Sequence, residues 1–252
     1  MNAPTRNPSA GQRPPSRRTD NNNARPQQRV ERNPAQRSPR PPVQDRTNRT
    51  PKAFLPRHPE LQITNEMQIT DGKHRGVQLQ TTLSPKVRPT ARRVRESLFN
   101  ILGKRIRFTR FLDLCAGSGA VGTEAISRGA SLCTFVERSG KMCRYIRLNL
   151  TTCQICPTGH GEIVQMEILP FLKRMAARRR RWDIVYFDPP YQADYDEVLQ
   201  FFARGALLKK EGGILIIEHP AEMFFPESLG KLIRRRVARE GETALTFYER
   251  IG

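Results

Sequence analysis

The first fifty residues lack leucine, isoleucine, phenylalanine, tyrosine and tryptophan, and they contain no lysine. Eleven arginines, nine prolines and seven asparagines stand beside only three acids, so this stretch has a formal net charge of +8. A segment without large apolar side chains cannot bury enough surface to offset the entropy lost on ordering. We therefore predict that residues 1–57 are a disordered basic tail and that the folded part begins after it.

Long apolar runs are also missing. No stretch has the length of a membrane span, and the N-terminus lacks the apolar segment of a signal peptide, so we expect a cytoplasmic protein without a membrane partner. The five cysteines form an odd set and are expected to be reduced thiols. Cys153 and Cys156 have the spacing of half a zinc site, but no second pair of ligands follows, so we predict no metal.

Positive charge dominates the rest of the chain as well, because residues 51–252 carry +12 of the total formal charge of +20. This charge favours a polyanionic partner. Nucleic acid fits better than a membrane surface, since no amphipathic stretch accompanies the charge. A generic solubilising tail is the alternative for the N-terminal part.

The most informative stretch is Asp188-Pro189-Pro190-Tyr191, which follows an apolar segment at 182–187. That segment is typical of a buried strand, and ligands of open α/β sheets bind beyond the carboxyl ends of such strands. Each proline lacks an N–H and keeps the preceding residue extended, so the stretch presents a carboxylate and carbonyl oxygens. These acceptors suit an exocyclic amine, and Tyr191 offers a ring for base stacking. An ordinary turn is the alternative.

A glycine-rich turn joins an apolar strand at 111–114 to a following helix. Gly117, Gly119 and Gly122 have the spacing of the dinucleotide fingerprint, and Glu137 ends the next strand, so a nicotinamide-dependent dehydrogenase has to be considered. Asp113 disfavours it, because a carboxylate there would repel a pyrophosphate but could hold an ammonium group. A cofactor with a sulfonium and no phosphates fits better than NAD.

Strands and helices alternate along the chain from this point. The apolar patterns predict strands at 111–114, 132–136, 162–166, 182–187 and 213–218, helices at 141–150 and 194–203, and a closing hairpin of 232–239 with 243–250. Alternation of this kind predicts an α/β fold with a doubly wound, mainly parallel sheet.

Two basic elements precede this sheet. Residues 61–83 predict a β-hairpin with a turn at 71–72, and its tip carries Lys73, His74 and Arg75. The segment 90–102 predicts a helix with one apolar face. Its arginines lie mostly off that face: Arg92, Arg93 and Arg95.

Residues 67–252 resemble the RsmD family of class I S-adenosylmethionine-dependent methyltransferases, which act on guanine N2 in 16S ribosomal RNA. The resemblance rests on the stretches Gly72–Gly76, Arg88–Asn100, Asp113–Gly122, Asp188–Tyr191 and Thr243–Tyr248. The third and fourth stretches occur across many methyltransferases and specify the reaction, whereas Arg88–Asn100 is specific to the family.

The resemblance implies a seven-stranded sheet in residues 105–252, with an N-terminal hairpin and helix extension in residues 58–104. It also implies S-adenosyl-L-methionine as the cofactor, with Asp113, Gly117 and Gly119 lining its methionine part. Glu137 would hold the ribose hydroxyls, and Glu167 would lie near the adenine amine.

For the substrate, the resemblance implies a catalytic stretch of Asp188, Pro189, Pro190 and Tyr191. Contacts to RNA are expected from Lys73, His74, Arg75, Arg88, Arg92, Arg93 and Arg95, and the basic groups would hold the RNA over Asp188. The expected partner is ribosomal RNA or a small-subunit assembly intermediate, bound by a monomer. Two alternatives stay open: an amino-methyltransferase acting on adenine N6 or cytosine N4 of DNA or another RNA, and a non-catalytic RNA-binding assembly factor.

Overall fold

The computed structural model of the protein describes residues 61–62, 67–82, 92–156, 158–190 and 195–252. All of them lie in one compact unit, Leu55–Gly252. The predicted tail, Arg88 and Tyr191 lie outside the described residues, so the interpretations given for them stay predictions.

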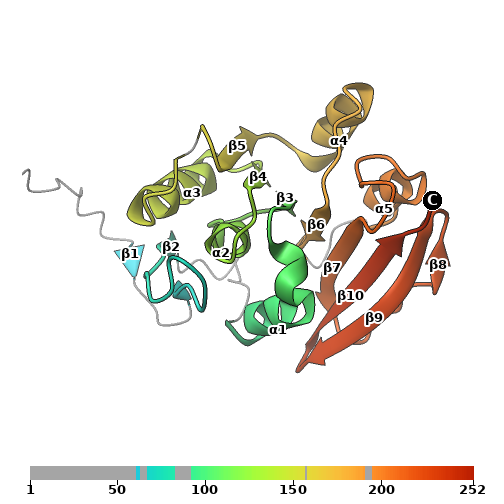
Figure 1. Ribbon diagram of the computed structural model, residues 1–252, viewed down its shortest axis with the longest axis horizontal. Helices are drawn as coiled ribbons and strands as arrows, with labels where there is room; N and C mark the ends of the chain where they lie inside the picture. Colours follow the sequence, from blue (N-terminus) through green and yellow to red (C-terminus); the bar gives the residue numbers. More distant parts are fainter. Residues whose placement is uncertain (1–60, 63–66, 83–91, 157, 191–194) are drawn as a thin grey trace, which may run out of the picture. The chain divides into compact units, whose positions relative to one another are not determined.

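The centre of this unit is an eight-stranded sheet with the strand order β5-β4-β3-β6-β7-β10-β9-β8 (Figure 1). Strands β5 to β7 in this order run parallel, and β10, β9 and β8 each pair antiparallel with the preceding strand. In chain order the strands are β3 Arg110–Leu114, β4 Leu132–Glu137, β5 Gly161–Gln165, β6 Ile184–Phe187, β7 Ile214–Pro220, β8 Ser228–Leu229, β9 Leu232–Glu240 and β10 Thr243–Arg250.

The sheet confirms the predicted doubly wound, mainly parallel architecture, but it has eight strands and not seven. The additional strand is β8, which pairs with the start of β9 at the edge of the sheet. A strand of two residues is too short to show the alternation of apolar and polar positions by which a strand is recognised.

Helices cover both faces of the sheet (Figure 1). One core cluster joins the apolar sides of α1, α2 and α3 to Phe111 and Ile184, and the other joins α4 and α5 to Leu112 and Val185. Successive strand residues thus point to opposite faces, as the pleat requires. The helices are α1 Arg92–Leu102, α2 Ala120–Ser127, α3 Gly140–Thr152, α4 Ile168–Ala177 and α5 Tyr195–Ala203, with a 3-10 turn η2 at Gly103–Ile106.

The sheet has two functionally different edges, which we name by the parallel strands. The carboxyl edge is where β4 ends at Glu137 and β6 is followed by Asp188. Helix α2 begins beside this edge and ends at Ser127, close to the point where β4 starts. There the Ser131 N–H donates to Thr109 O, just before β3, at 2.9 Å. Ser127 therefore lies at the opposite edge, the amino edge.

The predicted N-terminal hairpin is present. Strand β1 Leu61–Gln62 pairs antiparallel with β2 Thr81–Thr82, and Gln68 lies opposite Gln78 in an antiparallel bridge. The turn is longer than the predicted two residues, because the first bond across it runs from the Gly76 N–H to the carbonyl of residue 69 at 2.9 Å.

This turn is docked on the end of α2. The Lys73 N–H donates to Ser127 O at 2.8 Å, and the His74 N–H donates to Ser127 Oγ at 2.9 Å. Gly72 has φ +85°, and a Cβ there would lie 2.0 Å from Ser127 O. Only glycine permits this close approach, so the glycine of the turn fixes the hairpin against α2.

Within the described ranges, no helix is long and apolar enough to span a membrane.

Candidate active site

Four predicted acids lie along the carboxyl edge, one at each of four adjacent strands. Glu167 follows β5, Glu137 ends β4, Asp113 lies near the end of β3, and Asp188 follows β6. Residues that the sequence separates by up to 75 positions are thereby brought to one side of the sheet. A row of carboxylates suits a ligand that carries positive charge and repels one that carries phosphates.

Cys115 marks the centre of this row. Burial raises the pKa of its thiol, and the carboxylates of Asp188, Glu137 and Asp113 raise that pKa further. All three carboxylates thus act electrostatically on the same thiol. Cys115 was not predicted as a site residue; its φ of +63°, which is rare for a residue other than glycine, comes from the turn that places it there.

The acids also hold the glycine turn in place. Glu137 Oε2 accepts a hydrogen bond from the Gly117 N–H at 2.9 Å, and Glu137 Oε1 accepts one from the Ser139 N–H at 2.7 Å. Asp113 Oδ2 accepts a hydrogen bond from the Gly122 N–H at 2.9 Å. The turn at the end of β3 is thus fixed from both β3 and β4.

The glycines of the turn have different tasks. Gly117 has φ +55°, and a Cβ there would meet nothing nearer than Cys115 O at 3.9 Å, so the space beside it is open to a ligand. Gly122 lies against the sheet, since a Cβ there would lie 2.3 Å from the Phe135 ring. Open space at Gly117 and carboxylates around it fit a cofactor with cationic groups, as the sequence predicts.

Asp113 is almost completely buried, with 2% of its surface exposed. Burial raises the pKa of its carboxyl group to about 7, the Gly122 N–H opposes this rise, and Glu137 adds to it. The folded protein therefore holds a proton on Asp113 at pH values where the unfolded chain has released it.

We expect Asp113→Asn to change the pH dependence of stability. Between about pH 4 and pH 7 the folded state binds more protons at this site than the unfolded state does, so the contribution of Asp113 to stability falls as pH rises. The asparagine variant lacks this fall. Relative to wild type, it should gain about 1.4 kcal/mol or more between pH 5 and pH 8 in urea unfolding, the value of one pKa unit. Parallel curves for the two proteins would contradict the raised pKa.

Asp188 is half-buried, and its N–H donates to Leu114 O across a long 3.4 Å bond. The next two residues differ in exposure, because Pro189 is buried and Pro190 is exposed. The structure thus places Asp188 beyond the end of β6, beside the turn that follows β3. Its catalytic role, and the roles of Pro189 and Pro190, stay predictions.

Glu167 lies further out on the same edge. Its side chain is 63% exposed and forms an ion pair with Arg138, at 3.7 Å from Arg138 Nη1 to Glu167 Oε1. It precedes α4 without capping it through a side-chain hydrogen bond. Its assignment to the adenine amine stays a prediction.

The three helix arginines do not form one surface. Arg92 and Arg93 are exposed and pair with Glu96 and Glu240, at 2.8 and 3.0 Å. Because Glu240 ends β9 beside the carboxyl edge, the start of α1 lies near the edge that carries Asp188.

The prediction for Arg95 is wrong. Its side chain is fully buried and donates through Nε to Glu124 Oε2 at 2.9 Å and through Nη2 to Gln68 O at 2.6 Å. The guanidinium joins α1, α2 and the hairpin, and it has no surface to offer to RNA.

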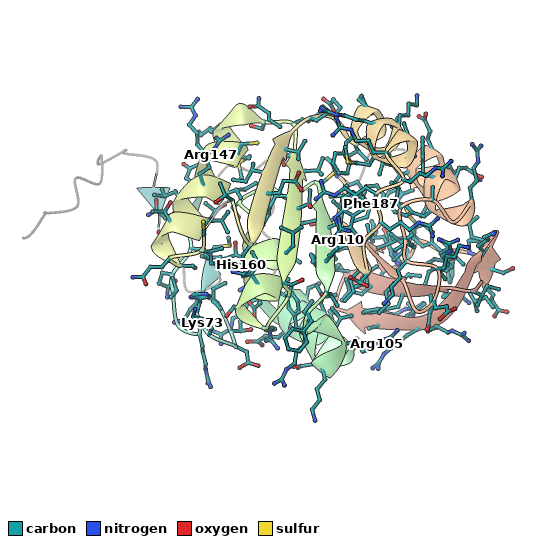
Figure 2. All side chains as sticks on the ribbon, turned by 45° about the horizontal axis from the view of Figure 1, so that its top comes forward. Lys73, Arg105, Arg110, Arg147, His160 and Phe187 are labelled. Atoms are coloured by element: carbon teal, nitrogen blue, oxygen red, sulfur yellow. The ribbon has the colours of Figure 1, made fainter. Side chains whose placement is uncertain are left out.

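The predicted position of the hairpin tip is also wrong. Lys73 and His74 are bonded to Ser127 at the amino edge, whereas Asp188 lies at the carboxyl edge. Figure 2 shows Lys73 at the lower left of the unit and Phe187, the residue before Asp188, further up and to the right. Lys73 and Arg75 are exposed, and burial together with Lys73 lowers the pKa of His74. That these residues bind RNA stays a prediction, but they do not lie over Asp188.

The base of the hairpin lies beside the cofactor turn instead. Asn149 Nδ2 donates to Ser118 O and to Gln80 O, both at 2.9 Å, and Asn149 Oδ1 accepts from the Gln80 N–H at 2.7 Å. This buried amide therefore fastens the hairpin to the glycine turn. No sequence pattern predicts this role, because an isolated asparagine in a helix has no distinguishing context.

The described part of the chain contains no group of three or more histidine, cysteine, aspartate or glutamate side chains that could hold a metal ion. Cys153 is buried and Cys156 is exposed.

Comparisons with known proteins identify the family of this chain. The model of a family described as Conserved hypothetical protein 95 matches residues 67–249. Ribosomal RNA small subunit methyltransferase D of Escherichia coli K12 is 31% identical over 188 residues, which cover 74% of this chain and 91% of that protein.

Solved structures show the same fold. The Escherichia coli protein yhhF, a proposed methyltransferase, has a TM-score of 0.61 and 30% identity, with 73% of this chain and 98% of that chain covered. A second proposed methyltransferase, SMU.776, was solved in complex with SAH; it is 17% identical, covers 76% of this chain and 56% of its own, and has a TM-score of 0.59. The protein therefore belongs to the Conserved hypothetical protein 95 family, the RsmD family of methyltransferases.

Proposed function

We propose that the protein transfers a methyl group from S-adenosyl-L-methionine to the exocyclic N2 amine of a guanine in small-subunit ribosomal RNA. The observation that carries this proposal is the position of Asp113, Glu137 and Asp188 at the carboxyl ends of three adjacent strands, with Glu137 bonded to the Gly117 N–H and the Asp188 N–H bonded to Leu114 O. Asp188, whose carboxylate could accept hydrogen bonds from an amine, thereby lies beside the glycine turn, where the other two acids suit a cationic cofactor. The choice of guanine in small-subunit RNA rests on the family and on the name of the Escherichia coli relative.

The residues around the turn would hold the cofactor, which supplies an electrophilic methyl group on a sulfonium. Asp113, Gly117 and Gly119 would line the methionine part. Glu137 already accepts two backbone hydrogen bonds, but each carboxylate oxygen has a second lone pair, with which it would accept from the ribose hydroxyls. Glu167 would receive the adenine amine.

Asp188 and Pro189 would position the amine. The lone pair on guanine N2 is delocalised into the ring, so this nitrogen is a poor nucleophile. Hydrogen bonds from its two N–H groups to the Asp188 carboxylate and the Pro189 carbonyl would orient it and stabilise the positive charge that develops on it. The amine releases one proton after the transfer, and Asp188 can pass it to water. Pro190 and Tyr191 would complete the wall on which the extruded base stacks.

Arginines would position the RNA without reading its sequence, since contacts to phosphates fix register only. Arg92 and Arg93 lie near the carboxyl edge, and Arg88 of the same segment is expected to join them. Lys73, His74 and Arg75 would contact a more distant part of the RNA at the amino edge, and the arginines of the tail would add contacts. We propose a monomer that acts in the cytoplasm on ribosomal RNA or a small-subunit assembly intermediate.

The test is to incubate the protein with methyl-labelled S-adenosylmethionine and separate pools of ribosomal RNA, small-subunit particles, transfer RNA and DNA. We expect label in small-subunit RNA alone, recovered as N2-methylguanosine after nucleoside digestion. Label recovered in N6-methyladenine or N4-methylcytosine would show that the substrate is another base, while the proposed mechanism of amine methylation would still hold. Binding of the cofactor and RNA without any transfer would instead indicate a non-catalytic assembly factor.

A further inference from the structure

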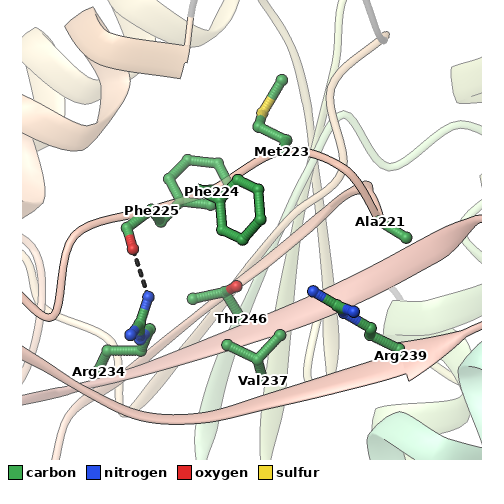
Figure 3. Close-up of a pocket in the computed structure, with 8 residues that line it drawn as sticks. All are labelled: Ala221, Met223, Phe224, Phe225, Arg234, Val237, Arg239 and Thr246. Carbon is green, nitrogen blue, oxygen red and sulfur yellow. Dashed lines mark hydrogen bonds between the residues drawn. The ribbon is translucent and has the colours of Figure 1, made fainter.

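A pocket lies over β9 and β10, beside the loop that leaves β7 at the carboxyl edge. Figure 3 shows it between the loop that follows β7 and the strand β9. We name it the Phe224 pocket; it has a volume of about 360 Å³, and its principal lining residues are Met223, Phe224, Phe225, Arg234, Val237 and Arg239. Because β7 lies next to β6 in the sheet, the loop leaves the same edge from which Asp188 projects.

The pocket combines apolar surface with positive charge. Phe224 is 81% exposed and Val237 is 43% exposed, and both line the same hollow. Single exposed apolar side chains are common on proteins, but here an aromatic ring and an aliphatic side chain lie beside two arginines. A ring with nearby guanidinium groups is the arrangement that proteins use to bind single-stranded nucleic acid, by stacking on bases and contacting phosphates.

The two arginines differ in what they already bind. Arg234 Nη1 donates to Phe225 O, and Arg234 Nη2 lies 3.5 Å from Glu227 Oε1. Arg239 is exposed and, among the described residues, has no carboxylate within ion-pair distance. Arg234 is therefore part of the wall, whereas Arg239 is free to contact an anion.

The wall of the pocket is fixed on its inner side. The Phe225 ring lies 5.8 Å from the Tyr195 ring and 4.7 Å from the His219 ring. His219 Nδ1 donates to Pro220 O and its Nε2 accepts from Thr246 Oγ1, both at 2.8 Å. Burial lowers the pKa of His219, which favours the neutral ring in this pair of roles. A fixed wall reduces the entropy that binding would otherwise cost.

The same rings join the pocket to the catalytic stretch. Tyr195 packs edge-on against Phe187 at 5.8 Å, and Phe187 directly precedes Asp188. The Tyr195 ring centre lies 5.8 Å from the ring centres of both Phe187 and Phe225, so these two rings are separated by at most twice that distance. When an enzyme extrudes a base, contacts to the flanking nucleotides help to select the substrate, and those nucleotides must lie close to the extruded one.

We propose that the Phe224 pocket binds a nucleotide next to the target guanine, with Phe224 stacked on its base and Arg239 in contact with its phosphate. This inference rests on the proposed function for the identity of the nucleic acid as RNA. It assigns the pocket a role in holding the single-stranded RNA that leads into the site.

The test compares Phe224→Ala with Phe108→Ala in the full-length protein. Phe108 is the matched control, because it is 86% exposed and precedes β3 at the amino edge. With saturating S-adenosylhomocysteine present, binding of a fluorescein-labelled single-stranded oligoribonucleotide is followed by anisotropy. We expect Phe224→Ala to weaken binding roughly tenfold, the loss of one base stack, and Phe108→Ala to change it less than twofold. Phe224→Trp should bind as well as wild type.

Two further measurements separate the contribution of the Phe224 ring to RNA binding from that of the Arg239 charge. An oligoribonucleotide with abasic positions should bind wild type and Phe224→Ala equally, because no base is left to stack. Arg239→Gln should lower the slope of log affinity against log salt by about 0.7, as expected when one phosphate contact to a single strand is lost.

The outcomes distinguish this inference from the proposed function. If guanine is methylated and Phe224→Ala binds RNA like wild type, the inference fails and the function stands. If Phe224→Ala loses RNA binding but no nucleic acid is methylated, the pocket is confirmed and the proposed function fails. If Phe224→Ala lowers methylation only on particles that contain ribosomal proteins, and not binding of naked RNA, the pocket contacts protein and the inference is overturned.

Discussion

Asp188→Ala should lower the rate of methyl transfer by about 100-fold or more while cofactor affinity and stability stay close to wild type. The carboxylate lies at the end of β6, outside the hydrogen bonds by which Asp113 and Glu137 hold the glycine turn. Its removal should leave that turn intact but take away the carboxylate that we propose to orient the amine. Loss of one such polar group in a preorganised site typically costs two to three orders of magnitude in rate.

Single-turnover measurements with saturating S-adenosylmethionine and small-subunit RNA check this, alongside calorimetric titration of S-adenosylhomocysteine. Glu211→Ala is the control, because Glu211 is an exposed carboxylate before β7 at the amino edge. It should leave the rate unchanged. If Asp188→Ala turns over at the wild-type rate, Asp188 is not the partner of the amine. If it loses cofactor affinity as well, Asp188 belongs to the cofactor site.

The sheet and its carboxyl edge were predictable because they depend on local patterns. Apolar runs with period two or without polar interruption predicted the five parallel strands and the closing hairpin to within two residues at nearly every boundary. Once the strands are parallel, whatever follows each of them gathers at one edge. The convergence of Asp113, Glu137 and Asp188 thus follows from topology and needs no knowledge of side-chain packing.

Arg95 and the hairpin tip were not predictable in the same way. A helical pattern places Arg95 near the polar side of α1, and nothing near it in sequence indicates that Glu124, on another helix, provides a buried partner. The tip was expected over Asp188, but its place depends on Gly72 fitting against Ser127. Both contacts link segments more than twenty residues apart, and their formation is a matter of tertiary packing.

The Phe224 pocket was missed for a related reason. Its walls come from the loop after β7 and from one face of β9 and β10, and that face becomes defined only when the hairpin joins the sheet. The loop itself has no periodic pattern. An aromatic pair such as Phe224-Phe225 predicts core as readily as surface, and the structure separates them: Phe225 is buried and Phe224 is exposed.

Glu124 is the residue whose loss should most weaken the fold. Its carboxylate is fully buried and accepts hydrogen bonds from the Thr70 N–H at 3.2 Å, from Arg95 Nε at 2.9 Å and from Arg128 Nε at 3.0 Å. These donors come from the hairpin, from α1 and from the residue that follows α2. A single carboxylate thus joins the N-terminal extension to α2, the helix that packs on β3 and β4.

We expect Glu124→Ala to lower the free energy of unfolding by about 3–5 kcal/mol, because it leaves the buried guanidinium of Arg95 without its anion. Glu96→Ala is the matched control. It removes the acid of an exposed pair with Arg92 and should cost about 0.5 kcal/mol or less. Urea unfolding of the three proteins gives both differences. Adding Arg95→Met to Glu124→Ala should recover part of the lost stability, because the buried guanidinium is then removed together with its anion. If Arg95 contributed only through other contacts, the second substitution would lower the free energy of unfolding further. Equal stability of Glu124→Ala and Glu96→Ala would show that the extension is held by apolar packing, with the buried ion pair contributing nothing to its attachment.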